Sequence, residues 1–437
     1  MKKKMRYIII PILFMLLFSF TGNHQASANT DSLNLQGEAA ILIDGETGKV
    51  LYEKNADELL GVASMSKMMT EYLVLEAIHE GRISWDQEVT INEYVHKLSA
   101  APGLSNVGLT QGEKYTVLEL YEAMAIHSGN AAAVALAEVI SGTESNFVKL
   151  MNEKAEELEL EDYHFVNSTG LNNSSLLGNY PEGTDENDEN QMSARATAKL
   201  AYRLIHDFPE VLETASKAEL EFRDGRIYKN FNWMLPGLIY EYEGMDGLKT
   251  GSTDFAGYCF TATAERNGQR FISVIMNTGS QTERFAETEK LLNYAFSTFS
   301  EVELFPENLT IEDTETLPVV KGKEDSVKIA SAESIQLVIK NGEEDLYEPK
   351  IVIDEDKLNE DGELTAPVQK GDVVGYLTYT YDGQDLGFID GTDTIKVDVV
   401  ATESVEKANG FVLMMRGIGE FFSNLWSGIT KTIGSWF

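Results

Sequence analysis

The stretch Ala63-Ser64-Met65-Ser66-Lys67 decides the fold, because a strand-rich start precedes it and a long helical run follows it. Apolar residues recur at helical spacing from Met68 to Ala77, which predicts that Ser64 lies at the first turn of a helix. Ser64 and Lys67 then share one face. A serine hydroxyl becomes a nucleophile when a nearby base takes its proton, and a desolvated neutral lysine is such a base. The stretch therefore predicts a nucleophile–base pair at a helix amino end, where free N–H groups can stabilise a negative oxygen.

The Ser-x-x-Lys motif alone does not identify an active site, because it specifies two residues and occurs again at Ser404-Val405-Glu406-Lys407. Two further short motifs follow the first match. Ser128-Gly129-Asn130 opens an alanine-rich helical pattern, and Lys249-Thr250-Gly251 lies in a strand pattern. The order of the three motifs is more specific than any one of them. We expect the fold to bring all three to one cleft.

Strand patterns lie at both ends of the first domain, and helical patterns lie between them. The predicted elements, in order, are a hairpin over 40–52, helices within 60–158 and over 193–208, strands over 247–251, 257–264 and 270–276, and a helix over 284–299. This order predicts one α/β domain whose first and last strands share a sheet. A second unit over about 303–400 has short alternating strands separated by turn signals, and we interpret it as a small β-sandwich.

Both ends of the chain carry signals for the cell envelope. Basic residues precede an apolar run over 8–20 and the small-residue site Ala26-Ser27-Ala28, which is typical of a secretory signal cut after Ala28. From Phe411 to Phe437 apolar residues recur at steps of three and four, which favours an amphipathic helix lying in a membrane interface. The predicted organisation is a signal peptide over 1–28, a catalytic domain over 35–301, a β-rich domain over 302–400 and an anchoring helix over 405–437.

The charge balance restricts the possible partners. The chain carries 35 Lys and Arg against 71 Asp and Glu, a formal net charge of −36. Such an acidic protein is a poor ligand for nucleic acid, so we expect no nucleic-acid partner. With the two end signals, the charge predicts an exported protein on the outer face of the cytoplasmic membrane.

The three motifs and their surroundings resemble a known family. The matching phrases are Ala63-Ser64-Met65-Ser66-Lys67, Ser128-Gly129-Asn130, His164-Phe165-Val166-Asn167-Ser168-Thr169-Gly170-Leu171, Met192-Ser193-Ala194-Arg195 and Asp246-Gly247-Leu248-Lys249-Thr250-Gly251. The chain resembles the penicillin-recognising serine acyl-transferases and, among them, the D-alanyl-D-alanine carboxypeptidases, which are low-molecular-weight penicillin-binding proteins. The resemblance implies an α/β fold: an antiparallel sheet flanked by helices with a helical insert, followed by a small all-β domain and a C-terminal amphipathic helix.

The resemblance also implies catalytic roles. Ser64 is the acyl-ester nucleophile, which attacks the carbonyl between two terminal D-alanines, and Lys67 accepts its proton. Backbone N–H groups of Ser64 and Ser252 form the oxyanion hole. Ser128 relays a proton to the departing amine, and Asn130 orients Lys67 and a substrate amide.

The implied substrate-binding residues are Lys249, Thr250, Gly251, Ser252 and Arg284. Lys249 supplies a positive charge that helps keep Lys67 neutral and holds Ser128 in place. Thr250 and Arg284 bind the terminal carboxylate of the substrate, which needs such a cation. Water then hydrolyses the acyl-enzyme, and the reaction requires no metal or organic cofactor.

The implied partners are peptidoglycan stem peptides ending in D-Ala-D-Ala, β-lactam antibiotics as slow-turnover inhibitors, and a membrane surface. One alternative is a serine β-lactamase, but its deacylating Glu-x-x-Leu-Asn occurs here at Glu289–Asn293 and Glu355–Asn359, both on the wrong side of Lys249-Thr250-Gly251. The other is a non-catalytic protein that binds β-lactams or cell wall. Rapid turnover of penicillin would favour the β-lactamase, and no release of D-alanine from a peptide ending in D-Ala-D-Ala would favour the binding protein.

Overall fold

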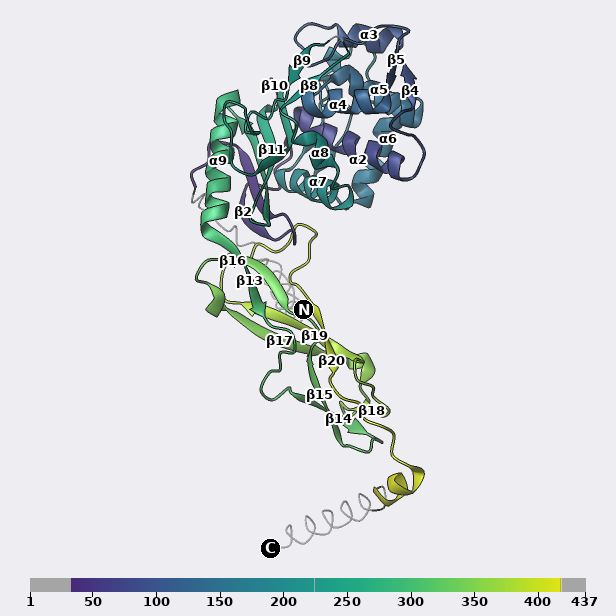
Figure 1. The fold of residues 1–437 in the computed structure, drawn as a ribbon, viewed down its shortest axis with the longest axis vertical. Coiled ribbons are helices and arrows are strands. Elements are labelled where there is room, and N and C mark those ends of the chain that lie inside the picture. Colours follow the sequence, from purple (N-terminus) through teal and green to yellow (C-terminus); the bar gives the residue numbers. More distant parts are fainter. Residues whose placement is uncertain (1–32, 224, 417, 419–437) are drawn as a thin grey trace, which may run out of the picture. The chain divides into compact units, whose positions relative to one another are not determined.

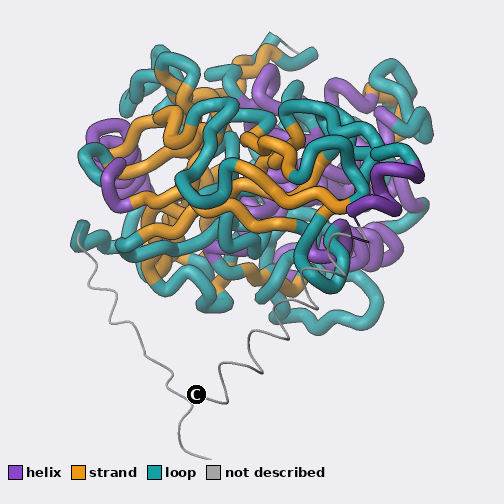
Figure 2. The backbone as a smooth tube through the Cα atoms, turned by 90° about the horizontal axis from the view of Figure 1, so that it is seen from below, coloured by secondary structure: helices purple, strands orange, loops and turns teal. Residues whose placement is uncertain are grey.

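The computed structural model of the chain describes residues 33–223, 225–416 and 418. The predicted signal peptide over 1–28 lies outside these residues. Figure 1 shows helices and strands mixed in the first part of the chain and strands dominating the second part, and Figure 2 colours the same backbone by secondary structure. Every helix within the described residues falls short of the length and hydrophobicity that crossing a membrane requires.

One antiparallel sheet of five strands, in the order β10-β11-β12-β1-β2, forms the centre of the first domain. Its strands are β1 (Ala39–Asp44), β2 (Val50–Lys54), β10 (Met245–Thr253), β11 (Gly257–Arg266) and β12 (Gln269–Thr278). Ala39 pairs with Met276, so the first and last strands are neighbours, as predicted. All six residues of β1 are buried, which explains its continuous apolar run, because both faces of this strand are covered.

Helices cover both faces of this sheet. Helix α9 contacts β11 and β12, whereas α7 contacts β1 and β12, and Figure 1 shows α9 across the sheet from α2, α7 and α8. The helices are α2 (Lys67–His79), α3 (Glu93–Ser99), α4 (Val117–His127), α5 (Asn130–Ser141), α6 (Glu144–Glu157), α7 (Ala194–Asp207), α8 (Val211–Ala215) and α9 (Gln281–Thr298). Each of the predicted helical segments is therefore present, and α9 begins three residues before the predicted start because Ser280 caps it.

Short elements complete the first domain. They are the strands β3 (Leu60–Gly61), β4 (Glu88–Thr90), β5 (Lys114–Thr116), β6 (Tyr163–His164), β7 (Gln191–Met192), β8 (Glu219–Glu221) and β9 (Ile227–Lys229), and the 3-10 turns η2 (Ala63–Ser66) and η3 (Asn173–Ser175). The turn η2 carries Ser64, so the nucleophile lies in a tight 3-10 turn just ahead of α2. Ser66 Oγ donates to the carbonyl oxygen of Ala63 at 2.7 Å, which stabilises this turn.

Two glycines let distant backbone segments press against this turn. A Cβ at Gly170 would lie 1.8 Å from the carbonyl oxygen of Ala63, and a Cβ at Gly251 would lie 2.5 Å from that of Val62. Gly170 also has φ +76°, a left-handed conformation that glycine adopts without steric cost. The loop over 167–171 and strand β10 therefore approach the nucleophile turn backbone to backbone.

The second domain is all-β, as predicted. It contains β13 (Phe299–Phe305), β14 (Thr316–Val320), β15 (Ser326–Ser331), β16 (Ile335–Lys340), β17 (Tyr347–Ile353), β18 (Leu364–Thr365), β19 (Val373–Tyr381), β20 (Val397–Ala401), η4 (Glu344–Leu346) and η5 (Glu355–Lys357). A two-stranded sheet and a six-stranded sheet share one apolar core. Strand β13 begins at Phe299, so the predicted boundary between 301 and 302 falls inside a strand.

The predicted anchoring helix over 405–437 lies mostly outside the described residues. Val405 and Lys407 form β-bridges with Val368 and Gly322, so the first residues of this segment belong to the β domain. Helical backbone begins at Gly410 and continues to residue 416.

Replacing Gly170 by Ala is expected to destabilise the protein by about 3 kcal/mol, because the new methyl group meets a backbone carbonyl and the residue must keep a left-handed φ. Gly178→Ala is the matched control, because Gly178 has φ +79° but open space around it. It is expected to cost about 1 kcal/mol. Urea unfolding of both variants measures the difference, and equal losses would show that the close approach to Ala63 does not matter.

Candidate active site

The Lys67 amine is the centre of the site. Lys67 is the first residue of α2, and its side chain is fully buried. Its Nζ donates to Asn130 Oδ1 at 2.8 Å and to the carbonyl oxygen of Thr169 at 2.6 Å, and it lies 3.0 Å from Ser64 Oγ. Three oxygens from three segments therefore fix the amine beside the hydroxyl of Ser64.

The surroundings of Lys67 favour its neutral form. Burial lowers the pKa of Lys67 well below its usual value, and the positive charge of Lys249 lowers it further, whereas Glu71 raises it. A neutral amine can accept a proton, and here it lies within hydrogen-bond distance of a serine hydroxyl. The pair can therefore generate an alkoxide nucleophile at Ser64.

Lys67 and the turn that carries Ser64 form the first wall of the site, and the connection between α4 and α5 forms the second. Ser128 ends α4 in a left-handed conformation, with φ 55°, and Asn130 is the first residue of α5. Asn130 Nδ2 donates to the carbonyl oxygen of Ser105 at 2.9 Å, so its Oδ1 points to Lys67. Both side chains are buried. The tight connection thus places a hydroxyl and an amide beside the base.

The third wall is strand β10. Burial, opposed by the charge of Glu71 and reinforced by that of Arg284, lowers the pKa of Lys249 to about 8. Lys249 Nζ donates to the carbonyl oxygen of Thr250 at 3.2 Å. Among the described residues it makes no hydrogen bond to Ser128, so the predicted direct hold on that hydroxyl is absent from this geometry.

Arg284 closes the site from α9. Its Nη1 donates to the carbonyl oxygen of Gly251 at 3.1 Å, and its Nε has no hydrogen-bond partner among the described residues. The guanidinium carbon lies 4.8 Å from the ring centre of Phe285 and 5.9 Å from that of Tyr258. Burial lowers the pKa of Arg284 to about 10, so the group is a cation at neutral pH.

The walls enclose a cavity of about 340 Å³. Its lining includes seven of the nine predicted site residues, namely Ser64, Ser128, Asn130, Thr250, Gly251, Ser252 and Arg284. The side chains of Lys67 and Lys249 lie buried behind it. The residues that line it, all within the described chain, include no Asp or Glu. The three motifs therefore meet at one cleft that is lined without a carboxylate.

Two contributions to the site were not predicted. The first is the carbonyl of Thr169, which is held in place because Asn167 Oδ1 accepts from the backbone N–H groups of Thr169 and Gly170 at 3.0 and 2.7 Å. The phrase over 164–171 contributes to the family resemblance, but the sequence assigns a role to none of its residues. The second is Glu71, a buried carboxyl one helical turn after Lys67. Its position four residues after the base was the available signal.

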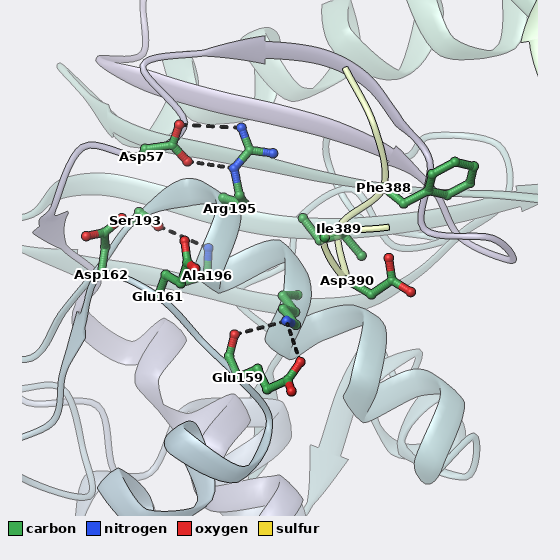
Figure 3. A pocket seen from close by; sticks show the side chains of 12 residues that line it. Asp57, Glu159, Glu161, Asp162, Ser193, Arg195, Ala196, Phe388, Ile389 and Asp390 are labelled. Carbon is green, nitrogen blue, oxygen red and sulfur yellow. Dashed lines mark hydrogen bonds and ion pairs between the residues drawn. The ribbon is translucent and has the colours of Figure 1, made fainter. Parts of the chain in front are cut away.

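A second cavity of about 380 Å³ has a different character (Figure 3). It contains none of the predicted site residues. Its basic groups are already engaged: Arg195 contacts Asp57 and Glu53, and Lys199 Nζ donates to the carbonyl oxygen of Glu159 at 2.9 Å. Across the described residues, no three His, Cys, Asp or Glu are placed to hold a metal ion.

Comparisons with known proteins agree with this geometry. A family model described as D-alanyl-D-alanine carboxypeptidase matches residues 24–280, and one described as Penicillin-binding protein 5, C-terminal domain, matches residues 299–407. The chain is 34% identical over 421 residues to D-alanyl-D-alanine carboxypeptidase DacF of Bacillus subtilis (strain 168), a match that covers 96% of this chain and 99% of DacF.

Solved structures are similar as well. The crystal structure of a peptidoglycan synthesis regulatory factor (PBP3) from Streptococcus pneumoniae matches with a TM-score of 0.70 and 36% identity, covering 85% of this chain and 100% of that one. Penicillin-Binding Protein D2 from Listeria monocytogenes in the ampicillin-bound form matches with a TM-score of 0.52 and 35% identity, covering 60% of this chain and 99% of that one.

The rate at which a fluorescent penicillin acylates the protein is expected to fall as pH rises above about 8. The pKa of Lys249 is lowered to about 8, so its cation is present below that pH and is lost above it. Stopped-flow fluorescence at a series of pH values measures this alkaline limb, the fall of the acylation rate as pH rises, and circular dichroism at each pH verifies that the fold persists. A rate that stays flat to about pH 10 would contradict the role of the Lys249 charge.

Proposed function

This chain belongs to the D-alanyl-D-alanine carboxypeptidase family, and from that membership we propose how its cleft divides the chemistry. The protein is a serine-type D-alanyl-D-alanine carboxypeptidase, a penicillin-binding hydrolase that acts on peptidoglycan peptides. The assignment of individual residues below is the proposal. The observation that carries it is the buried Lys67 amine, 3.0 Å from Ser64 Oγ.

In the first step Ser64 Oγ attacks the carbonyl carbon of the penultimate D-alanine, and Lys67 Nζ takes the hydroxyl proton. The backbone N–H groups of Ser64 and Ser252 donate to the oxygen that becomes negative. Both residues line the cleft, which supports this oxyanion hole. The peptide C–N bond then breaks, and the acyl group remains as an ester on Ser64.

The leaving amine needs a proton as the C–N bond breaks. Ser128 relays this proton from the Lys67 ammonium, and its position at the end of α4, beside the Asn130 that holds Lys67, supports the relay. Asn130 orients the base and binds a substrate amide. Lys249 acts through its charge, because a cation behind the cleft disfavours a lasting second cation at Lys67.

The free carboxylate of the terminal D-alanine is bound by Thr250 and Arg284, with Gly251 and Ser252 forming the adjoining strand edge. Arg284 is a buried cation on the cleft wall, which supports this assignment. A charge-assisted hydrogen bond to a carboxylate is stronger than one between neutral groups. This arrangement selects substrates whose scissile bond lies next to a free carboxylate.

Deacylation is the step that separates this enzyme from a β-lactamase. Water attacks the ester, a proton passes through Lys67, and Ser64 is released with the shortened peptide. The cleft lining in the described chain contains no carboxylate that could activate water, and the glutamates of the two Glu-x-x-Leu-Asn matches lie elsewhere, Glu289 on α9 and Glu355 in η5. We therefore expect a β-lactam ester on Ser64 to persist, which makes penicillin a slow-turnover inhibitor.

The protein is proposed to work in the cell envelope, at the outer face of the cytoplasmic membrane. The signal pattern over 1–28 supports export. The amphipathic pattern over 405–437 supports a peripheral anchor, as do the exposed apolar side chains at its start: Phe411 is 68% exposed and Met414 is 54% exposed. The β-rich domain over 302–400 links this segment to the catalytic domain.

The purified protein is expected to release D-alanine from a peptide that ends in D-Ala-D-Ala, whereas Ser64→Ala releases none above background, because the acyl-enzyme cannot form. A coupled D-amino-acid oxidase assay measures the release. Mass spectrometry of the wild type with benzylpenicillin is expected to show a long-lived adduct on Ser64.

Further measurements distinguish the carboxypeptidase from a β-lactamase and from a non-catalytic binding protein. The same peptide with a C-terminal amide is expected to be a poor substrate, because Arg284 and Thr250 then meet no carboxylate. Rapid recovery of free enzyme from the penicillin adduct would favour a β-lactamase. An adduct without any D-alanine release would favour a non-catalytic binding protein.

The full chain is expected to sediment with phosphatidylcholine vesicles, and a chain ending after Lys407 is expected to remain in the supernatant. Zwitterionic vesicles suit the test because the protein is strongly acidic and anionic lipids would repel it. Equal sedimentation of both chains would refute the anchor, while D-alanine release by both would show that the catalytic domain is intact.

A further inference from the structure

Glu71 is a buried carboxyl that the mechanism above does not use. It lies on α2 four residues after Lys67, and its side chain is 3% exposed. Within the described residues the carboxyl makes no hydrogen bond and no ion pair. Glutamate is almost never fully buried without a partner, because removing a carboxylate from water is costly. An apolar residue would fill this position at lower cost unless the charge has a role.

The charges around Glu71 indicate that role. Lys67, Lys249 and Arg284 are three basic residues buried at one cleft. Glu71 raises the pKa of both lysines, whereas Lys249 lowers that of Lys67 and Arg284 lowers that of Lys249. Glu71 is thus the one acid, among the described residues, that opposes the mutual repulsion of Lys67 and Lys249. Burial raises the pKa of Glu71 to about 7, and both lysines lower it.

The groups on neighbouring elements do not supply another charge. Burial raises the pKa of Tyr121, on α4, so its phenol is neutral, and burial lowers the pKa of His127, which faces Lys249. The other charged groups on or near α2 already have partners. Glu76 and Glu157 pair with Lys154. Asp207 contacts Arg203 and Tyr72, and Glu210 contacts His79. The field at Lys249 is therefore set mainly by Glu71 and Arg284.

We propose that Glu71 is a positioning residue that acts through Lys249, with its buried carboxylate serving as the countercharge that keeps Lys249 cationic beside a neutral Lys67. The helix places Lys67 and Glu71 on one face, one turn apart, and β10, which carries the buried Lys249, packs against the turn η2 that leads into this helix. The proposal rests on the roles assigned to Lys67 and Lys249 under the proposed function, and it adds the group that holds their charges apart.

These charges predict in which direction the pH dependence of activity shifts when the charge of Glu71 is removed. Above about pH 7 Glu71 is ionised, and its field favours the cationic form of Lys249. Removing that field leaves Lys249 buried with Arg284 nearby, so its proton is lost at lower pH. Activity should then disappear at lower pH on the alkaline side. Below about pH 7 Glu71 takes up a proton, so its removal has little effect on the acid side.

The test measures acylation by a fluorescent penicillin from about pH 6 to about pH 10 in the full-length protein. Glu71→Gln keeps the shape and removes the charge, and it is expected to move the alkaline limb down by about one pH unit. Glu71→Asp keeps the charge and is expected to restore most of the wild-type limb. Glu76→Gln is the matched control, because Glu76 lies on the same helix but pairs with Lys154. Its limb should match the wild type.

Thermal unfolding separates a charge effect from a structural one. Glu71→Gln is expected to lower the melting temperature more at about pH 8, where Lys249 loses its countercharge, than at about pH 6, where Glu71 of the wild type already carries a proton, while its rate at about pH 8 falls. A uniform loss of rate with an unmoved limb, or no change at all, would overturn the proposal. Glu71→Met gives the same readout should Glu71→Gln not fold, and failure of both to fold would mark a folding requirement and overturn it too. Absent acylation in the wild type would instead refute the proposed function.

Discussion

The chemistry of the cleft depends on one amine that is removed from water and held by three oxygens. Lys67 gains no charged partner in exchange for its burial; it gains the hydroxyl of Ser64, the amide of Asn130 and the carbonyl of Thr169. A neutral amine has two N–H groups, which donate to the amide and carbonyl oxygens, and its lone pair is then available to the hydroxyl of Ser64. The same burial that would destabilise an ammonium therefore produces a base of suitable strength at neutral pH.

Holding that amine requires three segments that are far apart in the chain. The nucleophile turn, the α4–α5 connection and the loop over 167–171 each contribute one oxygen, and β10 lies against the turn from the side of the sheet. Glycines at 170 and 251 allow backbone to approach backbone at these contacts. Main-chain packing around a short turn thus holds the site residues in position, and it does so more rigidly than flexible loops would.

Much of this arrangement could be predicted from the sequence, because periodicity and motif order reflect local geometry. The hairpin, the helices and the pairing of β1 with β12 follow from strand signals at both ends of the domain. The contribution of Thr169 could not be predicted, since every residue carries a carbonyl and only the tertiary fold aims this one. Glu71 lies at a readable helical spacing, but its burial depends on how α4, α5 and α7 pack over α2. Direct contact of Lys249 with Ser128 was expected, and the amine instead donates to a backbone carbonyl.

The strand order of the central sheet has a consequence for how the protein is made. Strand β1 lies between β2 and β12, and β12 is added only when the ribosome has passed residue 278. Until then the newly synthesised chain has an open apolar edge and cannot close its core. A chain that folds late can still pass unfolded through a translocation channel, which suits the export proposed above. The long sequence separation between the paired strands thus delays closure of the core until the last strands of the sheet have been made.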